Sequence, residues 1–165
     1  MKLSAAEFGK QHRSCILEER IEFDRRNPGK GQAGFYAACK NGGHLLWQLY
    51  KLSEDQLKPY RSSLVEVARR AAVRARKWAS MTVVYDIVDA DAYADYAAMD
   101  SANAANTAEK AAGGDAVFFV VRAATHAAKW AGQAAAFSGG RSRQHKELEL
   151  QAYDIKELIP VWPGE

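Results

Sequence analysis

The chain has 165 residues and a formal net charge of +3 at pH 7, with an isoelectric point near 8.8. This length favours a single domain. The weak positive charge argues against an extended nucleic acid as the partner and permits a small anionic ligand. It also argues against a role as inhibitor of a basic nuclease, because such an inhibitor would have an acidic surface.

Hydrophobic residues make up 48% of the chain, and many of them are alanine, the best helix former. We therefore expect closely packed helices with a few large residues as anchors. The candidate anchors are Trp47, Trp78, Tyr85, Phe118, Phe119 and Trp130.

The sequence also indicates a compartment. The opening segment MKLSAAEFGK lacks the apolar stretch of a secretory signal peptide, and no apolar run approaches the roughly 18 residues of a membrane-spanning helix. Cys15 and Cys39 have no CxxC spacing, so we expect reduced thiols. These features predict a cytoplasmic protein without a membrane partner.

The N-terminal part predicts three helices. A capping box at residues 4–7 begins the first, which ends before a glycine- and proline-containing loop over residues 24–32. A short helix over residues 34–40 follows and stops at the pair Gly42-Gly43. A strongly apolar helix then covers residues 44–52.

The remainder predicts four more helices. A second capping box at residues 53–56 leads into a helix over residues 60–79, with Pro59 tolerated near its first turn. Two alanine-rich helices follow over residues 84–112 and 115–137, each succeeded by a Gly-Gly pair. A last helix covers residues 142–159 and stops at Pro160.

No segment alternates polar and apolar residues as a strand does. The predicted fold is therefore all-α: a single compact bundle of about six or seven helices around two long alanine-rich helices.

Three segments resemble a known family: FYAACKNGGHLLWQLYKL (residues 35–52), the alanine-rich helices, and LQAYDIKELIP (residues 150–160). They are similar to the alanine-rich helical proteins of tailed phages and prophages, some of which are labelled putative immunity proteins. The matching residues are Cys39, Leu45, Leu46, Trp47, Gln151, Ile159 and Pro160, while His44 departs from the family's W-L-L-W pattern. The resemblance implies the helical fold and supplies no active-site residue.

An internal repeat gives the candidate binding residues. RRAAVRARKWA (residues 69–79) recurs as VRAATHAAKWA (residues 121–131), at an offset of 52 positions. Each copy places cations and a tryptophan on or beside one helix face, where cations can bind phosphate and an indole can stack on a base. The candidate ligand-binding residues are Arg70, Arg74, Lys77, Trp78, Arg122, His126, Lys129 and Trp130.

A structural interpretation of the same repeat competes with this one. The two tryptophans would be core anchors, and the cations would lie along the helices with their charges in water. Arg70 would then pair with Glu66, four residues earlier. We favour this interpretation for the tryptophans.

Three further groups of residues are candidates for chemistry. Asp86, Asp89, Asp91 and Asp95, with His126, could hold a divalent metal, but an acidic helix face that pairs with the arginine-rich helix is favoured. Cys39 and His44 lack a third, orienting group, and residues 25–32 (RRNPGKGQ) match no phosphate-loop motif. We expect no catalytic residue, no metal and no cofactor.

The predicted function is that of a non-enzymatic, phage-type counter-defence or immunity-like protein that sequesters a small anionic, nucleotide-derived ligand. The alternative is a protein-binding inhibitor or immunity factor that blocks a toxin or defence enzyme. A metal-dependent hydrolase is the least favoured. Alanine surfaces can also pair helices between chains, so a homo-oligomer is compatible with the sequence.

Overall fold

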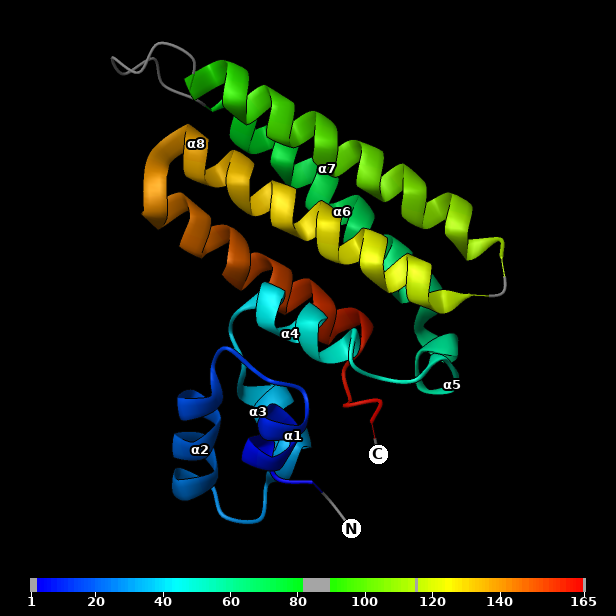
Figure 1. The fold of residues 1–165 in the computed structure, drawn as a ribbon. Helices are drawn as coiled ribbons and strands as arrows, with labels where there is room; N and C mark the ends of the chain where they lie inside the picture. Colours follow the sequence, from blue (N-terminus) through cyan, green and yellow to red (C-terminus); the bar gives the residue numbers. More distant parts are fainter. Residues whose placement is uncertain (1–2, 82–89, 115, 165) are drawn as a thin grey trace.

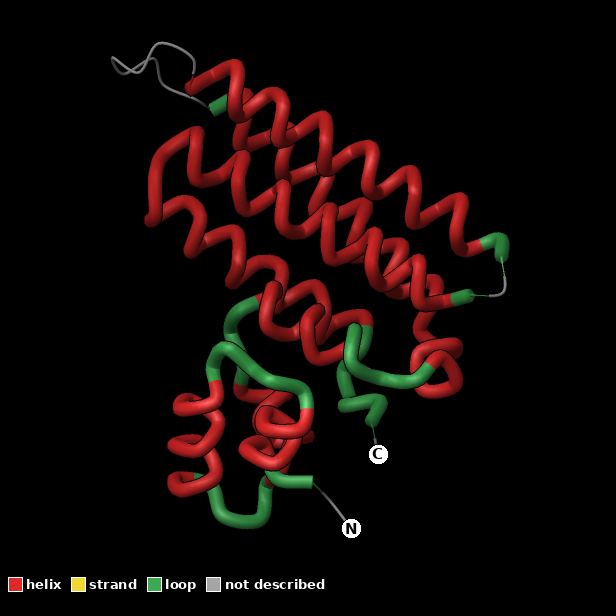
Figure 2. Tube along the Cα trace, in the orientation of Figure 1, coloured by secondary structure: helices red, strands yellow, loops and turns green. Residues whose placement is uncertain are grey.

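The computed structural model describes residues 3–81, 90–114 and 116–164. They form an all-α fold, without a strand in these ranges (Figures 1 and 2). The helices are α1 (Ala5–Gln11), α2 (Leu17–Arg26), α3 (Gly31–Ala38), α4 (Gly42–Leu49), α5 (Glu54–Leu57), the 3-10 turn η1 (Lys58–Tyr60), α6 (Arg61–Ser80), α7 (Ala90–Ala112) and α8 (Val117–Leu158). The all-α prediction is confirmed, and seven helices remain in the described residues when the single-turn α5 is set aside.

Three long helices form the bundle. Figure 1 shows α6, α7 and the two arms of α8 side by side, with α4 against the second arm and α1–α3 below it. Alanines of α6 and of the first arm of α8 belong to the same buried core: Ala71 and Ala75 on α6 and Ala124, Ala127 and Ala131 on α8 have no exposed surface. Small side chains let the two helix axes approach closely, so the alanines of the sequence repeat are packing residues.

Helix α8 folds back on itself where the sequence predicts a polar loop between two helices. Gly139 and Gly140 have non-helical backbone angles, and Gly140 has φ +74°, a region that favours glycine. The turn is therefore a two-residue kink, and the arm after it returns antiparallel to the arm before it (Figure 1).

The N-terminal helices differ from the prediction at their boundaries. The first predicted helix is divided into α1 and α2, with Arg13 at φ +52° in the connection. Residues 24–26 belong to α2 rather than to a loop, because Arg25 and Arg26 both pair with Glu22 on the helix surface.

The pair Gly42-Gly43 begins a helix where the sequence predicts the end of one. Asn41 caps α4 by accepting a hydrogen bond from the backbone N–H of His44. A Cβ at Gly42 would lie 2.2 Å from Cβ of Gln151 on α8. The glycine therefore permits a close approach of two helices rather than a helix stop.

Both predicted capping boxes are confirmed. Ser4 and Glu7 exchange hydrogen bonds at the start of α1, and Ser53 and Gln56 do so at α5. Pro59 lies in η1, directly before α6. The capping boxes thus fix where α1 and α5 begin.

The C-terminal segment, residues 159–164, contacts the N-terminal helices α1 and α3. Tyr36 on α3 donates a hydrogen bond from its hydroxyl to the carbonyl of Ile159, at 2.9 Å. The indole of Trp162 packs edge-on against the ring of Phe8, with centroids 5.4 Å apart. Across the described residues, none of the helices combines the length and apolarity that crossing a bilayer requires.

Candidate functional site

The first copy of the repeat faces the second arm of α8. Carboxylates of that arm form ion pairs with Arg70 and Arg74 of the repeat. Arg74 donates to both carboxylate oxygens of Glu147 at 3.0 Å and also pairs with Asp154. Arg70 donates to Asp154 at 3.1 Å and to Glu157 at 2.6 Å. We call this set, with Trp78, the α6–α8 ion-pair network.

Arg70 has the partner that the structural interpretation predicts, and Trp78 is partly buried at the edge of the core. The indole N–H of Trp78 donates to Glu147 at 2.8 Å, and Glu147 has no exposed side-chain surface. Arg70 also pairs with Glu66 at 3.0 Å, as predicted. Lys77 is exposed. The network therefore joins two helices, and its arginines already have anionic partners.

The second copy lies on the surface of the first arm of α8. Arg122, His126 and Lys129 are exposed, and the ammonium of Lys129 lies 5.5 Å from the ring centroid of Trp130. Trp130 is half-buried against the core. Arg122 and His126 line a small groove of about 260 Å³, to which the first copy contributes no described residue.

The predicted aspartate cluster falls only partly within the described chain. Asp86 and Asp89 lie outside the described residues, as does the side chain of Asp91, and Asp95 is exposed. In the described part of the chain, no group of three histidine, cysteine or acidic residues is placed to hold a metal.

Cys39 is placed as a packing residue. Its Sγ lies 3.5 Å from the carbonyl oxygen of Asn41, to which it donates. Burial raises the pKa of the Cys39 thiol, which lowers its thiolate fraction at neutral pH and makes it a weak nucleophile.

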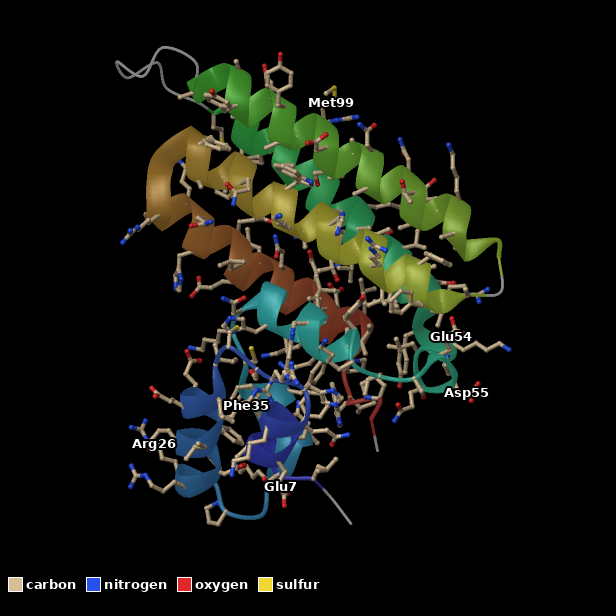
Figure 3. All side chains as sticks on the ribbon, viewed as in Figure 1. Glu7, Arg26, Phe35, Glu54, Asp55 and Met99 are labelled. Atoms are coloured by element: carbon tan, nitrogen blue, oxygen red, sulfur yellow. The ribbon has the colours of Figure 1, made fainter. Side chains whose placement is uncertain are left out.

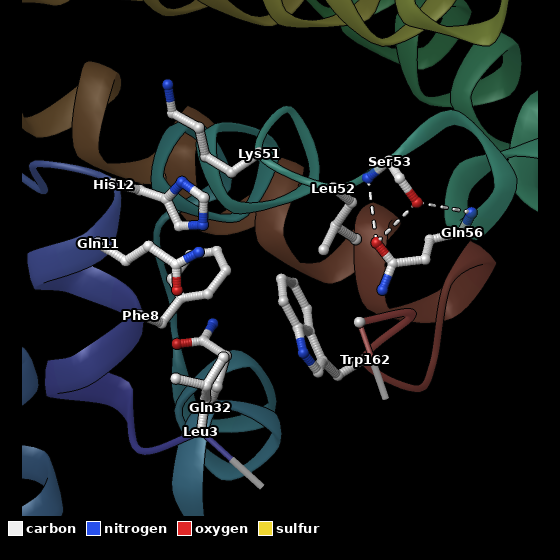
Figure 4. Close-up of a pocket in the computed structure, with 11 residues that line it drawn as sticks. Leu3, Phe8, Gln11, His12, Gln32, Lys51, Leu52, Ser53, Gln56 and Trp162 are labelled. Atoms are coloured by element: carbon white, nitrogen blue, oxygen red, sulfur yellow. Dashed lines mark hydrogen bonds between the residues drawn. The ribbon is translucent and has the colours of Figure 1, made fainter. Parts of the chain in front are cut away.

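A different cavity has the composition of a ligand site. It opens between the N-terminal helices and the α4–α5 connection, and we call it the polar cleft (Figure 4). Its volume of about 660 Å³ lies within the range of small-molecule sites. Its lining residues are Leu3, Phe8, Gln11, His12, Gln32, Lys51, Leu52, Ser53, Gln56, Trp162 and Gly164.

Donor groups predominate in the polar cleft. Lys51 carries a positive charge, and its ammonium lies 5.6 Å from the ring centroid of Trp47. The carboxamide oxygen of Gln56 accepts from the backbone N–H and the hydroxyl of Ser53 (Figure 4). Its NH₂ group has no hydrogen-bond partner among the described residues. None of the described residues that line the cleft is acidic.

His12 stands beside these cations. Its ring lies 4.5 Å from the ring of Phe8, centroid to centroid, and it is half-buried. Burial, with the nearby charges of Lys51 and Arg20, lowers its pKa below the ordinary value of 6.5. The imidazole is therefore neutral at pH 7 and can gain a proton when an anion is nearby.

Behind the cleft lies a fully buried arginine. Arg20 has no exposed surface, and its guanidinium carbon lies 4.4 Å from the ring centroid of Phe35 and 5.3 Å from that of Trp47. Among the described residues no carboxylate lies within ion-pair distance of it, and its Nη2 has no hydrogen-bond partner. Burial lowers its pKa to about 10, so it stays charged at pH 7.

A chain of carboxamides connects Arg20 to the cleft. Arg20 donates from Nη1 to Oε1 of Gln32 at 2.7 Å, and Gln32 donates from Nε2 to Oε1 of Gln48 at 2.5 Å. Gln48 in turn donates to the carbonyl of His44 at 3.0 Å. These bonds fix the orientation of the Gln32 carboxamide, which lines the cleft and has one N–H remaining.

None of the cleft residues was among the predicted ligand residues. The available signal was Arg20, which shares a helix face with Leu17 and Phe23, three positions on either side. An arginine on an apolar face requires a buried partner or an unusual environment. The other cleft residues come from separate elements, and only the fold brings them together.

Comparison with known proteins returns no match: no family model, no curated protein and no solved structure is significantly similar to this chain.

Proposed function

We propose that the protein is a non-catalytic binding protein that captures a small anionic ligand in the polar cleft. One observation carries the proposal. His12, the side chain of Lys51 and the carboxamides of Gln32 and Gln56 line it, with the charge of Arg20 next to Gln32 and no acidic side chain among the described lining residues. A cavity with this charge balance attracts anions and is left with unpaired donors without one.

The favoured ligand class is a nucleotide or another phosphorylated ring compound. Lys51 and His12 would bind the phosphate as charge-assisted donors, and the carboxamides of Gln32 and Gln56 would donate to neutral acceptors of the ligand. Phe8 and Trp162 supply an apolar wall. Capture would be stoichiometric, in keeping with the counter-defence role that the sequence resemblance suggests.

The proposal places the anion site away from the repeat. Arg70 and Arg74 are occupied by carboxylates of the protein itself, and Lys77, Arg122, His126 and Lys129 are exposed outside the cleft. The repeat would therefore stabilise the helix bundle, while the N-terminal helices would bind the ligand.

Calorimetric titration with inorganic phosphate, pyrophosphate and a panel of nucleotides tests this function. We expect saturable binding, weakened about tenfold or more in Lys51→Ala, because a charge-assisted hydrogen bond contributes roughly 1.5–3 kcal/mol. Lys77→Ala, the matched loss of an exposed lysine, should bind as the wild type does. The ligand should be recovered unchanged.

Two results would overturn the proposal. One is that no member of the panel binds. If a pull-down then recovers a protein partner, the protein-binding inhibitor is favoured instead. The other is equal affinity in Lys51→Ala and the wild type, which would move the site elsewhere.

A further inference from the structure

The face formed by α6 and α7 exposes large apolar side chains. Val73 is 69% exposed, Tyr96 62% and Met99 54%. Val73 lies one turn before Arg76 on α6, and Tyr96 lies one turn before Met99 on α7. Figure 3 shows Met99 pointing outward from the bundle. Tyrosine and methionine are enriched where proteins contact one another.

A groove of about 520 Å³ runs between these two helices. Its lining includes the small residues Ala79, Ala98 and Ala102, and Met99 stands at its edge. The face therefore offers a shallow floor of alanines next to a protruding side chain. A long side chain from another protein surface can pack into the groove above these alanines.

Two opposite charges line the same groove without pairing. Arg76 on α6 and Asp95 on α7 are both exposed, and neither forms an ion pair with any residue of the described ranges. At the adjacent rim, Arg69 and Glu109 pair across the two helices at 2.6 Å. Among the described residues that line the groove, Arg76 and Asp95 are thus one unpaired cation and one unpaired anion, so the groove is complementary to itself.

We propose that the α6–α7 face is the interface of a homodimer. A two-fold axis through the groove sets Arg76 of each copy against Asp95 of the other and Met99 of each against the alanine floor of the other. An isologous interface requires this kind of self-complementarity, in which one patch supplies both the protrusion and the recess. A strongly charged partner of another kind would leave one of the two charges opposed by a like charge.

Sedimentation velocity over a range of concentrations tests the dimer with charge exchanges. We expect the wild type to dimerise, and Arg76→Asp and Asp95→Arg each to raise the dissociation constant about tenfold or more, because each puts like charges opposite one another. The double variant Arg76→Asp/Asp95→Arg should regain dimerisation. Lys77→Asp, the same charge change one residue along α6 and outside the groove lining, should dimerise as the wild type does.

A second variant tests the apolar contact. Met99→Asp should be monomeric, and because Met99 is exposed, its circular dichroism and melting temperature should match those of the monomeric charge variants. A wild type that stays monomeric at its highest soluble concentration overturns the proposal, even if another protein binds this face. So does a dimer that persists in Arg76→Asp, Asp95→Arg and Met99→Asp. The polar cleft shares no lining residue with the groove, so ligand binding can fail while the dimer stands, and the reverse.

Discussion

Arg74 and Arg20 both place a guanidinium group between helices, the first largely and the second fully buried, but they have opposite surroundings. Arg74 lies between α6 and the second arm of α8 against the carboxylates of Glu147 and Asp154. Arg20 lies within the N-terminal helices against the rings of Phe35, Trp47 and Phe8 and the carboxamide of Gln32. One interior charge is neutralised, and the other is not.

This difference separates a structural from a binding role for buried cations. A paired charge cancels the field of its partner, and losing either member leaves the other uncompensated. An unpaired charge costs desolvation free energy and keeps a positive potential in its surroundings. We therefore expect the two arginines to respond differently to the same substitution.

The largest expected effect is on the α6–α8 ion-pair network. Arg74→Met should lower the free energy of unfolding by roughly 3–5 kcal/mol, because it leaves the fully buried Glu147 without its cation. Urea denaturation followed by circular dichroism measures the change. Lys77→Met on the same helix is the matched control and should change stability by less than about 0.5 kcal/mol. An equal loss in both variants would show that the network contributes no more than an exposed side chain.

The same substitution at Arg20 should cost less. Arg20→Met removes donors from Gln32, from the hydroxyl of Ser14 and from the carbonyl of Ala5. Leaving the buried Gln32 oxygen unpaired costs about 1–3 kcal/mol, but the substitution also removes the desolvation penalty of an unpaired guanidinium. The net loss should be smaller than for Arg74→Met, and anion affinity should fall although Arg20 does not line the cleft. A loss as large as that of Arg74→Met would mean that Arg20 is mainly a structural residue.

The sequence predicts local structure well where a short motif specifies it. The capping boxes at Ser4 and Ser53 are confirmed because their partners lie three residues away. The boundary at Gly42 is wrong because the glycine serves a contact with Gln151, more than a hundred residues later in the chain. Local composition cannot distinguish a helix stop from a close helix crossing.

The same limit applies to the candidate site. Arg70, Arg74 and Trp78 contact the same arm of α8, while Lys77 is exposed. The carboxylates that pair with the two arginines come from the second arm of α8. Whether a cation is free depends on residues that meet it only after folding. His12, Lys51 and Trp162 carry no common spacing, so the polar cleft has no pattern in the sequence.

A smaller effect concerns pH. The pKa of His12 is lowered in the free, folded protein. As the pH falls through the ordinary pKa of 6.5, the unfolded chain therefore binds more protons at His12 than the folded chain does. His12 thus makes the free protein less stable as the pH falls through this range. A bound anion favours the protonated ring, so affinity should rise as the pH falls through this range, by up to about tenfold for a shift of one pKa unit.

Titrations at several pH values with an organic sulfate, whose charge does not change there, isolate the contribution of His12. His12→Gln keeps a hydrogen-bonding side chain and should remove the dependence. If the wild type and His12→Gln show the same pH profile, His12 takes no part in binding the anion.

The smallest expected effect returns to the network. Trp78→Phe keeps the ring packed against the core but removes the indole N–H that donates to Glu147. Glu147 retains the cation of Arg74 and a hydrogen bond from Gln151, so the loss should be that of one hydrogen bond, about 0.5–1.5 kcal/mol. Trp130→Phe is the matched control, because its ring is half-buried in the second copy of the repeat, and no Nε1 hydrogen bond within the described chain is lost with it. If both variants lose the same stability, the tryptophans act by packing alone; a larger loss in Trp78→Phe assigns the difference to the bond with Glu147.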